Sequence, residues 1–353
     1  MSSNPVKTHF TKQILSWFDE FGRHDLPWQN TQDPYQIWVS EIMLQQTQVK
    51  TVIPFYTRFM ERFPDIASLA SADQDEVLHC WTGLGYYARA RNLHKAAQAI
   101  VSDHNGVFPT RLDDVIELSG IGRSTAGAIL SFAFSQRHAI LDGNVKRVLS
   151  RYFGVEGWPG KTAVSSQLWR IAENQTPKKD VAKYTQAIMD FGATLCTRSK
   201  PQCNICPLAE SCIAFNLQAI EKFPGRKPKK SLPMRTSTVL LLKNHQAEWL
   251  LMQRPPTGIW GSLWSFPELS DSLDSIIAGN RFNFAGTNVF VETIGSTFTH
   301  TFSHFHLEIT PVHAMLDQQS SIEILDQPSV WYDPKKPLQI GLAAPIKKLL
   351  QSV

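Results

Sequence analysis

The chain has 353 residues, of which 42% are hydrophobic and 19% charged, and its formal net charge is +4. This composition is typical of a globular protein with two domains and excludes a largely disordered chain. Residues 1–10 lack the apolar segment of a signal peptide, and no apolar run reaches the roughly 18 residues of a membrane span. We therefore expect a cytoplasmic protein that does not contact a membrane.

The N-terminal part of the chain has a helical pattern. Apolar residues at helical spacing run from Ile37 to Phe59, with a break at Gln45–Gln48. A further helix over Leu112–Ile116 ends at Gly120, and a new apolar face follows from Ala126 to Phe134. Since no segment here alternates as a strand does, we predict an all-α domain over residues 1–221.

Residues 222–235 contain three prolines and six basic residues, which predicts an extended linker. Beyond it the pattern changes to that of strands. Thr238–Leu242 and Trp249–Met252 predict a hairpin, the alternation after Phe305 predicts another strand, and Leu342–Leu350 predicts a closing helix. We therefore predict a second domain, α/β or α+β, over residues 236–353.

Positive charge is concentrated next to the linker. Between Lys178 and Arg235 there are 11 Lys or Arg and only 4 Asp or Glu. Such a segment is consistent with a polyanionic partner such as nucleic acid, although basic runs are more often solvated surface.

Two glycines stand two residues apart, at Gly120 and Gly122, directly before a predicted helix. The free N–H groups at the start of that helix favour a phosphate, as in a helix-hairpin-helix that holds a DNA backbone. An ordinary turn between two helices explains the local pattern equally well.

Four of the five cysteines have the spacing C-x6-C-x2-C-x5-C, namely Cys196, Cys203, Cys206 and Cys212. Four thiolates on one short loop bind a tetrahedral metal ion or an iron–sulfur cluster. Zinc is the commoner of the two, and the spacing alone does not decide between them.

Several long motifs together resemble a known family. The segment Leu118–Asp142 followed by the cysteine motif resembles the endonuclease III superfamily of helix-hairpin-helix DNA glycosylases. Trp38–Gln48, Gly83–Arg91 and Leu141–Arg147 resemble motifs of its MutY branch, the adenine glycosylases. The resemblance implies base excision repair, with hydrolysis of the N-glycosidic bond of adenine opposite 8-oxoguanine or guanine in double-stranded DNA.

The resemblance also implies a cofactor and a setting. It implies that the four cysteines hold a 4Fe–4S cluster rather than zinc, over the loop 196–212, with a structural and DNA-contacting role. We further expect a monomer of bacterial type, associated with the nucleoid.

Glu41 occupies the position of the family's general acid, and Asp142 that of the superfamily's carboxylate. Adenine leaves readily only after protonation, and the sugar then develops positive charge that a carboxylate stabilises. Asn144 resembles the family's helper near the leaving base or sugar. Without the family, each carboxylate is more simply a surface charge or a helix cap.

Ser124 stands where superfamily members with lyase activity carry a lysine. Without that amine, the enzyme would be monofunctional and leave an abasic site. The alternative, a glycosylase/lyase for oxidised pyrimidines, is disfavoured by Ser124. Some family members have tyrosine here, so the role of Ser124 itself stays open.

Further positions of the family contact DNA. Gln46 and Tyr86 match residues that wedge into the duplex, and Thr47 and Leu84 lie beside them. Trp28 resembles part of the adenine pocket. Tyr87 is more simply a core aromatic residue.

The second domain resembles the MutT-like (Nudix) domain of this family. A Nudix hydrolase needs a glutamate-rich helix, but Glu268–Asn280 has one glutamate, so we expect no nucleotide hydrolysis. The resemblance implies that Ser303 and His304 read 8-oxoguanine. A metal site of His300, His304, His306 and His313 is the less favoured alternative. A DNA-binding protein without catalysis, or a nucleotide pyrophosphatase, remains a competing function.

Overall fold

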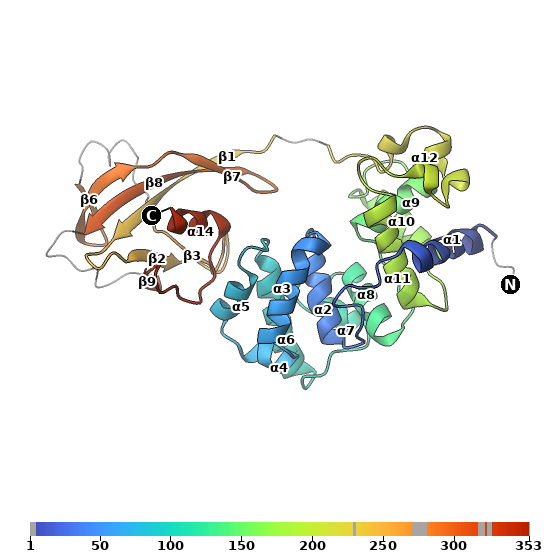
Figure 1. Ribbon diagram of the computed structural model, residues 1–353, viewed down its shortest axis with the longest axis horizontal. Coiled ribbons are helices and arrows are strands. Elements are labelled where there is room, and N and C mark those ends of the chain that lie inside the picture. The colour runs from blue at the N-terminus through green and yellow to red at the C-terminus, as the bar shows by residue number, and fades with distance from the viewer. Residues whose placement is uncertain (1–4, 229–230, 270–280, 317–321, 323–326, 353) are drawn as a thin grey trace. The chain divides into compact units, whose positions relative to one another are not determined.

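The computed structural model describes residues 5–228, 231–269, 281–316, 322 and 327–352. The chain forms two compact units, which Figure 1 shows from N- to C-terminus in colour. The helical unit comprises residues 1–71 and 92–229, and the C-terminal unit comprises residues 72–91 and 230–353. Residues 72–91 lie within the predicted all-α domain over residues 1–221, but their contacts place them in the C-terminal unit.

The N-terminal part of the chain is helical, as predicted, and the first strand among the described residues begins at Met234. The helices before it are α1 (Pro5–Phe21), α2 (Pro34–Leu44), α3 (Val49–Arg62), α4 (Ile66–Ser71), α5 (Gln74–Trp81), α6 (Ala88–Asp103), α7 (Leu112–Glu117), α8 (Arg123–Phe134), α9 (Gly143–Tyr152), α10 (Thr162–Gln175), α11 (Val181–Asp190) and α12 (Ile213–Asn216).

Local signals in the sequence explain where helix α2 begins and ends. The Asp33 side chain accepts a hydrogen bond from the Tyr35 N–H, and Pro34 occupies the first position of α2. The helix ends at Leu44, and α3 starts at Val49. The predicted break at Gln45–Gln48 is therefore confirmed.

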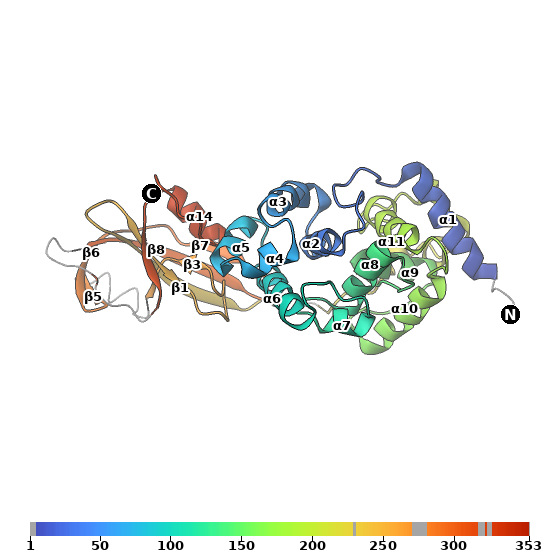
Figure 2. The same cartoon turned by 90° about the horizontal axis from the view of Figure 1, so that it is seen from below.

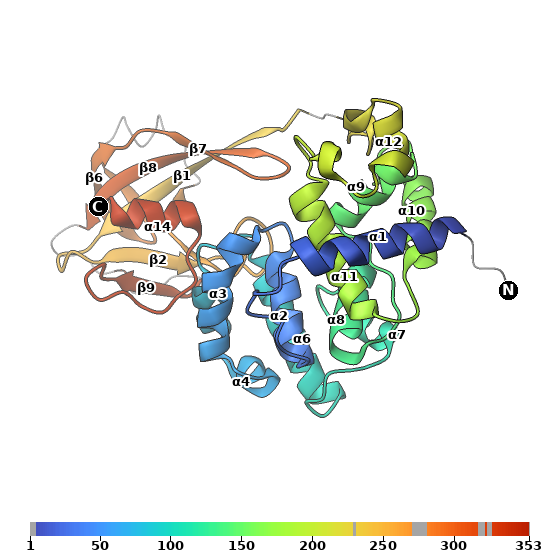
Figure 3. The same ribbon diagram turned by 45° about the vertical axis from the view of Figure 1, so that its right-hand side comes forward.

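An apolar core packs α1 against α8 to α11, which include the helix that Asp142 caps. Phe10 and Ile14 of α1 are fully buried against Leu149 of α9, Leu168 of α10 and Phe191. Figures 2 and 3 show α8 to α11 packed side by side, with α1 across α11. The chain ends of these helices are thereby held in fixed positions.

The chain changes its helical form after α11. A π-helical turn, η1 (Phe191–Leu195), continues α11 directly. The cysteine loop then contains two short 3-10 turns, η2 (Cys203–Ile205) and η3 (Ala209–Ser211), and η4 (Ile220–Lys222) leads into the linker. A π turn inside a helix often marks a functional region.

The C-terminal unit is built on a mixed sheet with the strand order β3-β2-β1-β8-β6-β5. The strands are β1 (Met234–Lys243), β2 (Trp249–Gln253), β3 (Trp264–Ser265), β4 (Glu268–Leu269), β5 (Arg281–Phe284), β6 (Thr287–Ile294), β7 (Phe298–Thr301), β8 (His306–Leu316) and β9 (Ser329–Tyr332). The central strands β1 and β8 are parallel, and the other strand pairs among the described residues are antiparallel.

The predicted hairpin is confirmed as β1 and β2, and the predicted strand after Phe305 is β8. The closing helix is α14 (Ala344–Gln351), whose Ile346 is fully buried. The stretch Glu268–Asn280, which lacks the glutamates of a Nudix hydrolase, is described only in part. Glu268 and Leu269 form β4, and residues 270–280 lie outside the described residues. No helix in the described part of the chain is long and apolar enough to cross a membrane.

Candidate active site

The helical unit contains a cleft of about 2220 Å³. Its walls come from the ends of α2, α8 and α9, from the cysteine loop and from the start of the linker. The predicted site residues that line it are Trp28, Glu41, Gln46, Thr47, Ser124, Asp142, Asn144 and Cys203. The predicted residues Leu84, Tyr86, Ser303 and His304 belong to the C-terminal unit.

Glu41 projects into the cleft from α2. Its helix neighbours Trp38 and Ile42 are buried, and Glu41 itself is half-buried. Burial, and to a smaller extent the negative charge of Asp142, raise the pKa of Glu41 to about 8. A carboxyl group with this pKa keeps its proton at neutral pH, so Glu41 is suited to act as a general acid.

Asp142 is the N-cap of α9. One carboxylate oxygen accepts a hydrogen bond of 2.7 Å from the Val145 N–H, and the other accepts one of 3.4 Å from the Asn144 amide. Burial raises the pKa of Asp142 above its ordinary value, and the hydrogen bond from Val145 and the positive charge of Arg147 offset only part of this rise. The cap fixes this carboxylate in direction, and its hydrogen bonds favour the ionised form.

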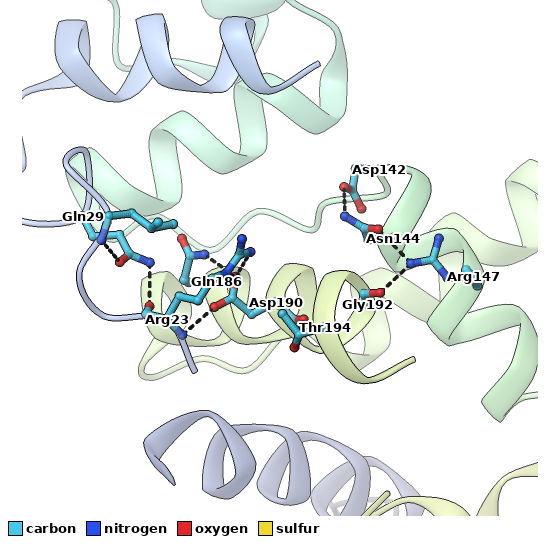
Figure 4. Close-up of polar contacts among 10 residues, drawn as sticks. Arg23, Gln29, Asp142, Asn144, Arg147, Gln186, Asp190, Gly192 and Thr194 are labelled. Atoms are coloured by element: carbon cyan, nitrogen blue, oxygen red, sulfur yellow. Dashed lines mark hydrogen bonds and ion pairs between the residues drawn. The ribbon is translucent and has the colours of Figure 1, made fainter. Parts of the chain in front are cut away.

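Asn144 connects Asp142 to a wider network, drawn in Figure 4. Arg147 donates to the Asn144 side-chain oxygen at 2.8 Å and to the Gly192 carbonyl at 2.6 Å. Its Nε also donates to the Cys196 carbonyl at 2.8 Å. A Cβ on Gly192 would lie 2.7 Å from the Asn144 Cβ, so only glycine permits this close approach. These contacts therefore hold α9 against the π-helical turn and the cysteine loop.

The Ser124 side chain contacts the backbone that precedes Asp142. Its Oγ accepts a hydrogen bond of 2.9 Å from the Leu141 N–H, directly before Asp142 in the chain. The hydroxyl thus anchors the backbone that leads into the α9 cap. Sequence reasoning left this role open, because the partner is 17 residues away.

The glycine pair forms a tight hairpin before α8. Gly120 has a φ of 82°, and a Cβ there would lie 2.8 Å from the Asn92 Cβ. Gly122 is the N-cap of α8 and offers no side chain to the first-turn N–H groups. Neither glycine is among the residues that line the cleft.

A buried ion pair on the cleft wall was not predicted. Asp190 is fully buried and accepts hydrogen bonds from the Arg23 N–H at 2.9 Å and from the Arg23 Nε at 3.1 Å. Gln186 donates to the same carboxylate at 2.9 Å. Figure 4 shows both partners converging on Asp190, and Arg23 and Gln186 also line the cleft. No sequence signal finds this pair, since 167 residues separate its members.

The other residues predicted on this side differ in exposure. Trp28 is 6% exposed and packs edge-on against Tyr56, with 5.3 Å between ring centroids. Gln46 is exposed and has a φ of 58°, a left-handed conformation that is rare outside glycine. Thr47 donates to the Gln45 carbonyl at 3.4 Å. Trp28 is therefore a wall of the cleft, and Gln46 lies on its rim.

The four cysteines gather at one edge of the helical core, where Cys196, Cys206 and Cys212 pack. Burial, with smaller contributions from the charges of the other three thiols, raises the pKa of Cys206 to about 12, so all four sulfurs share one neighbourhood. Arg151 donates to the Cys196 sulfur at 3.4 Å. Among the described residues, no three His, Cys, Asp or Glu side chains are close enough to hold a single metal ion. Four gathered thiols fit the ligand set of a four-iron cluster, whose irons each bind a different thiolate.

The start of the linker forms part of the cleft. The Gly225 N–H donates to the Gly157 carbonyl at 2.9 Å, which fixes the chain against the turn before α10. The Lys227 ammonium lies 5.8 Å from the centroid of the Trp158 ring. Because Arg226 and Lys227 both line the cleft, the predicted positive charge faces it.

In the C-terminal unit, the loop between β7 and β8 carries Ser303 and His304. Both are exposed, and the Ser303 Oγ lies 3.3 Å from the His304 Nδ1. Behind them Phe302 stacks on Phe305, with 4.5 Å between ring centroids. His306 bonds Thr301 at 3.0 Å instead of sharing a ligand with His304. The alternative histidine metal site is not formed among the described residues.

The same unit contains the turn with Leu84 and Tyr86. Tyr86 is 52% exposed and has a φ of 51°. Leu84 is 6% exposed, so its side chain, unlike that of Tyr86, is not accessible at the surface. Tyr87 is buried, in agreement with its interpretation as a core residue.

Comparison with known proteins identifies both parts of the chain. Residues 39–174 match the HhH-GPD superfamily of base excision DNA repair proteins, and residues 238–352 match the NUDIX domain. The solved structure of a thermostable thymine-DNA glycosylase superposes with a TM-score of 0.55 at 28% identity, over 60% of this chain and 97% of that one. The predicted multidomain fold is thereby confirmed.

Similarity to curated proteins extends over the whole chain. An adenine DNA glycosylase of Buchnera aphidicola subsp. Acyrthosiphon pisum is 40% identical, over 98% of this chain and 98% of the relative. That of Buchnera aphidicola subsp. Baizongia pistaciae is also 40% identical, over 98% of this chain and 96% of the relative. With its helix-hairpin-helix domain, its Nudix domain and this full-length similarity, the chain belongs to the adenine DNA glycosylase family.

Proposed function

We propose that this protein removes adenine paired with 8-oxoguanine or guanine in double-stranded DNA and leaves an abasic site. The observation that carries the proposal is the pair of carboxyl groups on one cleft. Glu41 is protonated at neutral pH because its pKa is about 8, and Asp142 is held by hydrogen bonds that favour its ionised form. A carboxyl group that keeps its proton, beside a second carboxyl group capped by hydrogen bonds, suits acid-assisted cleavage of a glycosidic bond.

The chemistry requires the base to leave the helix. A flipped adenine enters the cleft beside Trp28, and Glu41 donates its proton to a ring nitrogen of the base. The N-glycosidic bond then breaks, its electron pair stays with adenine, and the sugar becomes an oxocarbenium ion that Asp142 stabilises. Water adds to the sugar carbon, and its proton passes to a carboxylate of the site.

The protein would be a monofunctional glycosylase. Position 124 carries a hydroxyl, and this hydroxyl accepts the Leu141 N–H, so it supports the backbone of Asp142. Without an amine at this position, no covalent adduct with the sugar forms there. A lyase would cut the strand without further treatment, and we expect no such cut.

The cysteines Cys196, Cys203, Cys206 and Cys212 would hold a 4Fe–4S cluster. When bound, the cluster ties the loop 196–212 into a fixed shape and supplies no step of base release. Arg147 and Arg151 bond to this loop, through the Cys196 carbonyl and the Cys196 sulfur respectively. The basic residues around the loop would then face the DNA backbone.

The C-terminal unit would recognise the base opposite adenine. Ser303 and His304 are exposed polar groups on an aromatic base, which suits hydrogen bonding to an oxidised purine. Gln46 and Tyr86 would insert into the duplex, and the hairpin at Gly120 and Gly122 would bind a phosphate. We expect the protein to act as a monomer.

Single-turnover adenine release tests this function. Duplexes carrying A opposite 8-oxoguanine, G or T are incubated with an excess of the protein, and strand cleavage is measured with and without alkali. We expect alkali-dependent cleavage at adenine opposite 8-oxoguanine or G, and none opposite T. Cleavage without alkali would instead indicate a lyase, and release from the A·T duplex would contradict mispair specificity.

A further inference from the structure

The turn that carries Tyr86 places this tyrosine in a backbone conformation that a non-glycine residue does not favour. Gly83, Gly85 and Tyr86 have φ values of 106°, 74° and 51°. Glycine adopts these angles easily, but a tyrosine in the left-handed region is strained. Such a residue keeps its conformation only where surrounding contacts hold it.

Part of the support comes from the same segment. The Trp81 indole N–H and the Arg89 guanidinium both donate to the Gly85 carbonyl, each at 3.1 Å. The Arg89 guanidinium also lies 5.5 Å from the centroid of the Tyr86 ring. These contacts fix the shape of the turn, and the cation of Arg89 packs against the exposed ring of Tyr86.

The rest of the support comes from the C-terminal end of the chain. The Tyr87 hydroxyl donates to the Leu342 carbonyl at 2.8 Å and accepts the Gly83 N–H at 3.4 Å. In return, the Leu342 N–H donates to the Thr82 hydroxyl at 3.4 Å. A residue 255 positions away in the chain is thus bonded to both ends of the turn.

Other contacts show that this link belongs to an extended interface within the C-terminal unit. The carboxylate of Asp75 accepts the Trp264 indole N–H at 3.0 Å and the Gln253 amide at 3.2 Å. Arg91 donates to the Gly261 carbonyl at 2.7 Å. A Cβ on Gly341 would lie 2.6 Å from the Leu78 Cβ, so the packing at this point is close.

The interface also reaches the loop with Ser303 and His304. Gly261 follows Trp260, whose ring packs against His300 at 5.8 Å and against Phe302 at 5.7 Å between centroids. The segment 72–91 and the region around the β7–β8 loop therefore both contact the adjacent residues Trp260 and Gly261.

We propose that Tyr87 is a positioning residue, whose hydroxyl fixes the Tyr86 turn to the C-terminal chain at Leu342. The C-terminal unit would then set where Tyr86 meets the duplex, in addition to contacting the lesion base. This inference rests on the proposed role of Tyr86 as a DNA wedge. Tyr87 itself touches no substrate, because its side chain is buried.

A double-mutant cycle on the full chain tests the inference. The variants are Tyr86→Ala, Tyr87→Phe and the double variant, with Tyr332→Phe as the control for loss of a buried tyrosine hydroxyl elsewhere in the unit. The probe is a duplex with a non-cleavable 2′-fluoro-deoxyadenosine opposite 8-oxoguanine and a fluorescent 2-aminopurine beside the lesion. Affinity and the unstacking of 2-aminopurine are both measured, and thermal unfolding is recorded for each variant.

We expect Tyr86→Ala to weaken binding about tenfold or more, through the loss of stacking. Tyr87→Phe should weaken binding about fivefold, because both hydrogen bonds of the Tyr87 hydroxyl are lost, and should lower the 2-aminopurine signal. In the Tyr86→Ala background the same change should have almost no effect, because the ring that it positions is gone. Tyr332→Phe should change neither readout.

Two failures are distinguishable. Additive losses in the cycle would overturn the positioning role and leave the wedge intact. If Tyr86→Ala binds as well as the unmodified chain, the wedge role itself is wrong, and the inference falls with it. If Tyr87→Phe does not fold, Thr82→Val removes the hydroxyl on the other side of the link, and the same cycle decides.

Discussion

The cleft of the helical unit and the β7–β8 loop of the C-terminal unit differ in how their polar side chains are buried and held. In the cleft, charged groups are buried and fixed by partners far along the chain, as Asp190 is by Arg23. In the loop, Ser303 and His304 are exposed and bond to each other, on a layer of aromatic rings. Burial shifts the pKa values that acid catalysis needs, whereas recognition of a base needs accessible hydrogen-bonding groups. The cleft should therefore govern rate, and the loop selectivity.

The largest effect should come from Glu41→Gln. The amide keeps the size of the side chain but has no acidic proton, so we expect adenine release to fall by about a thousandfold or more. Single-turnover assays measure the rate, and titration with a labelled duplex measures affinity, which should change little. Glu61→Gln alters an exposed glutamate of α3 and serves as the matched control. Full activity in Glu41→Gln would remove this residue from the mechanism.

Breaking the buried ion pair should be the next largest effect. Arg23→Met leaves the fully buried Asp190 carboxylate without its charged partner, which costs about 3 kcal/mol of unfolding free energy. Denaturant unfolding measures the loss, and Arg23→Lys should recover part of it. Arg123→Met is the control, because its partner Glu173 is half exposed and such pairs contribute about 0.5 kcal/mol. Equal losses in the two variants would show that burial of the carboxylate is unimportant.

Sequence and structure agree most closely where one short motif carries the residue. Glu41 and Asp142 are found from their motifs, and the spacing of the cysteines marks their loop. Arg23 and Asp190 are not found, because nothing local connects residues 167 positions apart. The sequence also does not predict that residues 72–91 pack with the C-terminal unit, for a related reason. Helical periodicity shows that α5 has a buried face, but it does not say which part of the chain covers that face.

The pH dependence should follow the raised pKa of Glu41. Above about pH 8 Glu41 loses its proton, so the rate of adenine release should fall about tenfold per pH unit.

The raised pKa of Glu41 also makes the free energy of unfolding depend on pH. Between the ordinary value of 4.5 and about 8, the folded chain binds a proton that the unfolded chain has lost, so this contribution to stability decreases as pH rises. Glu41→Gln should remove that contribution, and a rate that is constant from pH 7 to pH 9.5 would contradict the assignment of the acid.

The smallest effect should come from the loop. In a Ser303→Ala, His304→Ala variant, the hydrogen bonds to the opposite base are lost, but the aromatic support of Phe302 and Phe305 stays in place. We expect the preference for 8-oxoguanine over guanine to fall about tenfold, because one or two hydrogen bonds of about 1 kcal/mol each are removed. The rate on the A·G duplex should be unchanged, and this is what separates the loop from the cleft. Competition between the two duplexes in one reaction measures the preference directly. If both duplexes slowed equally, the loop would contribute to catalysis or folding, and the division of labour between the two regions would not hold.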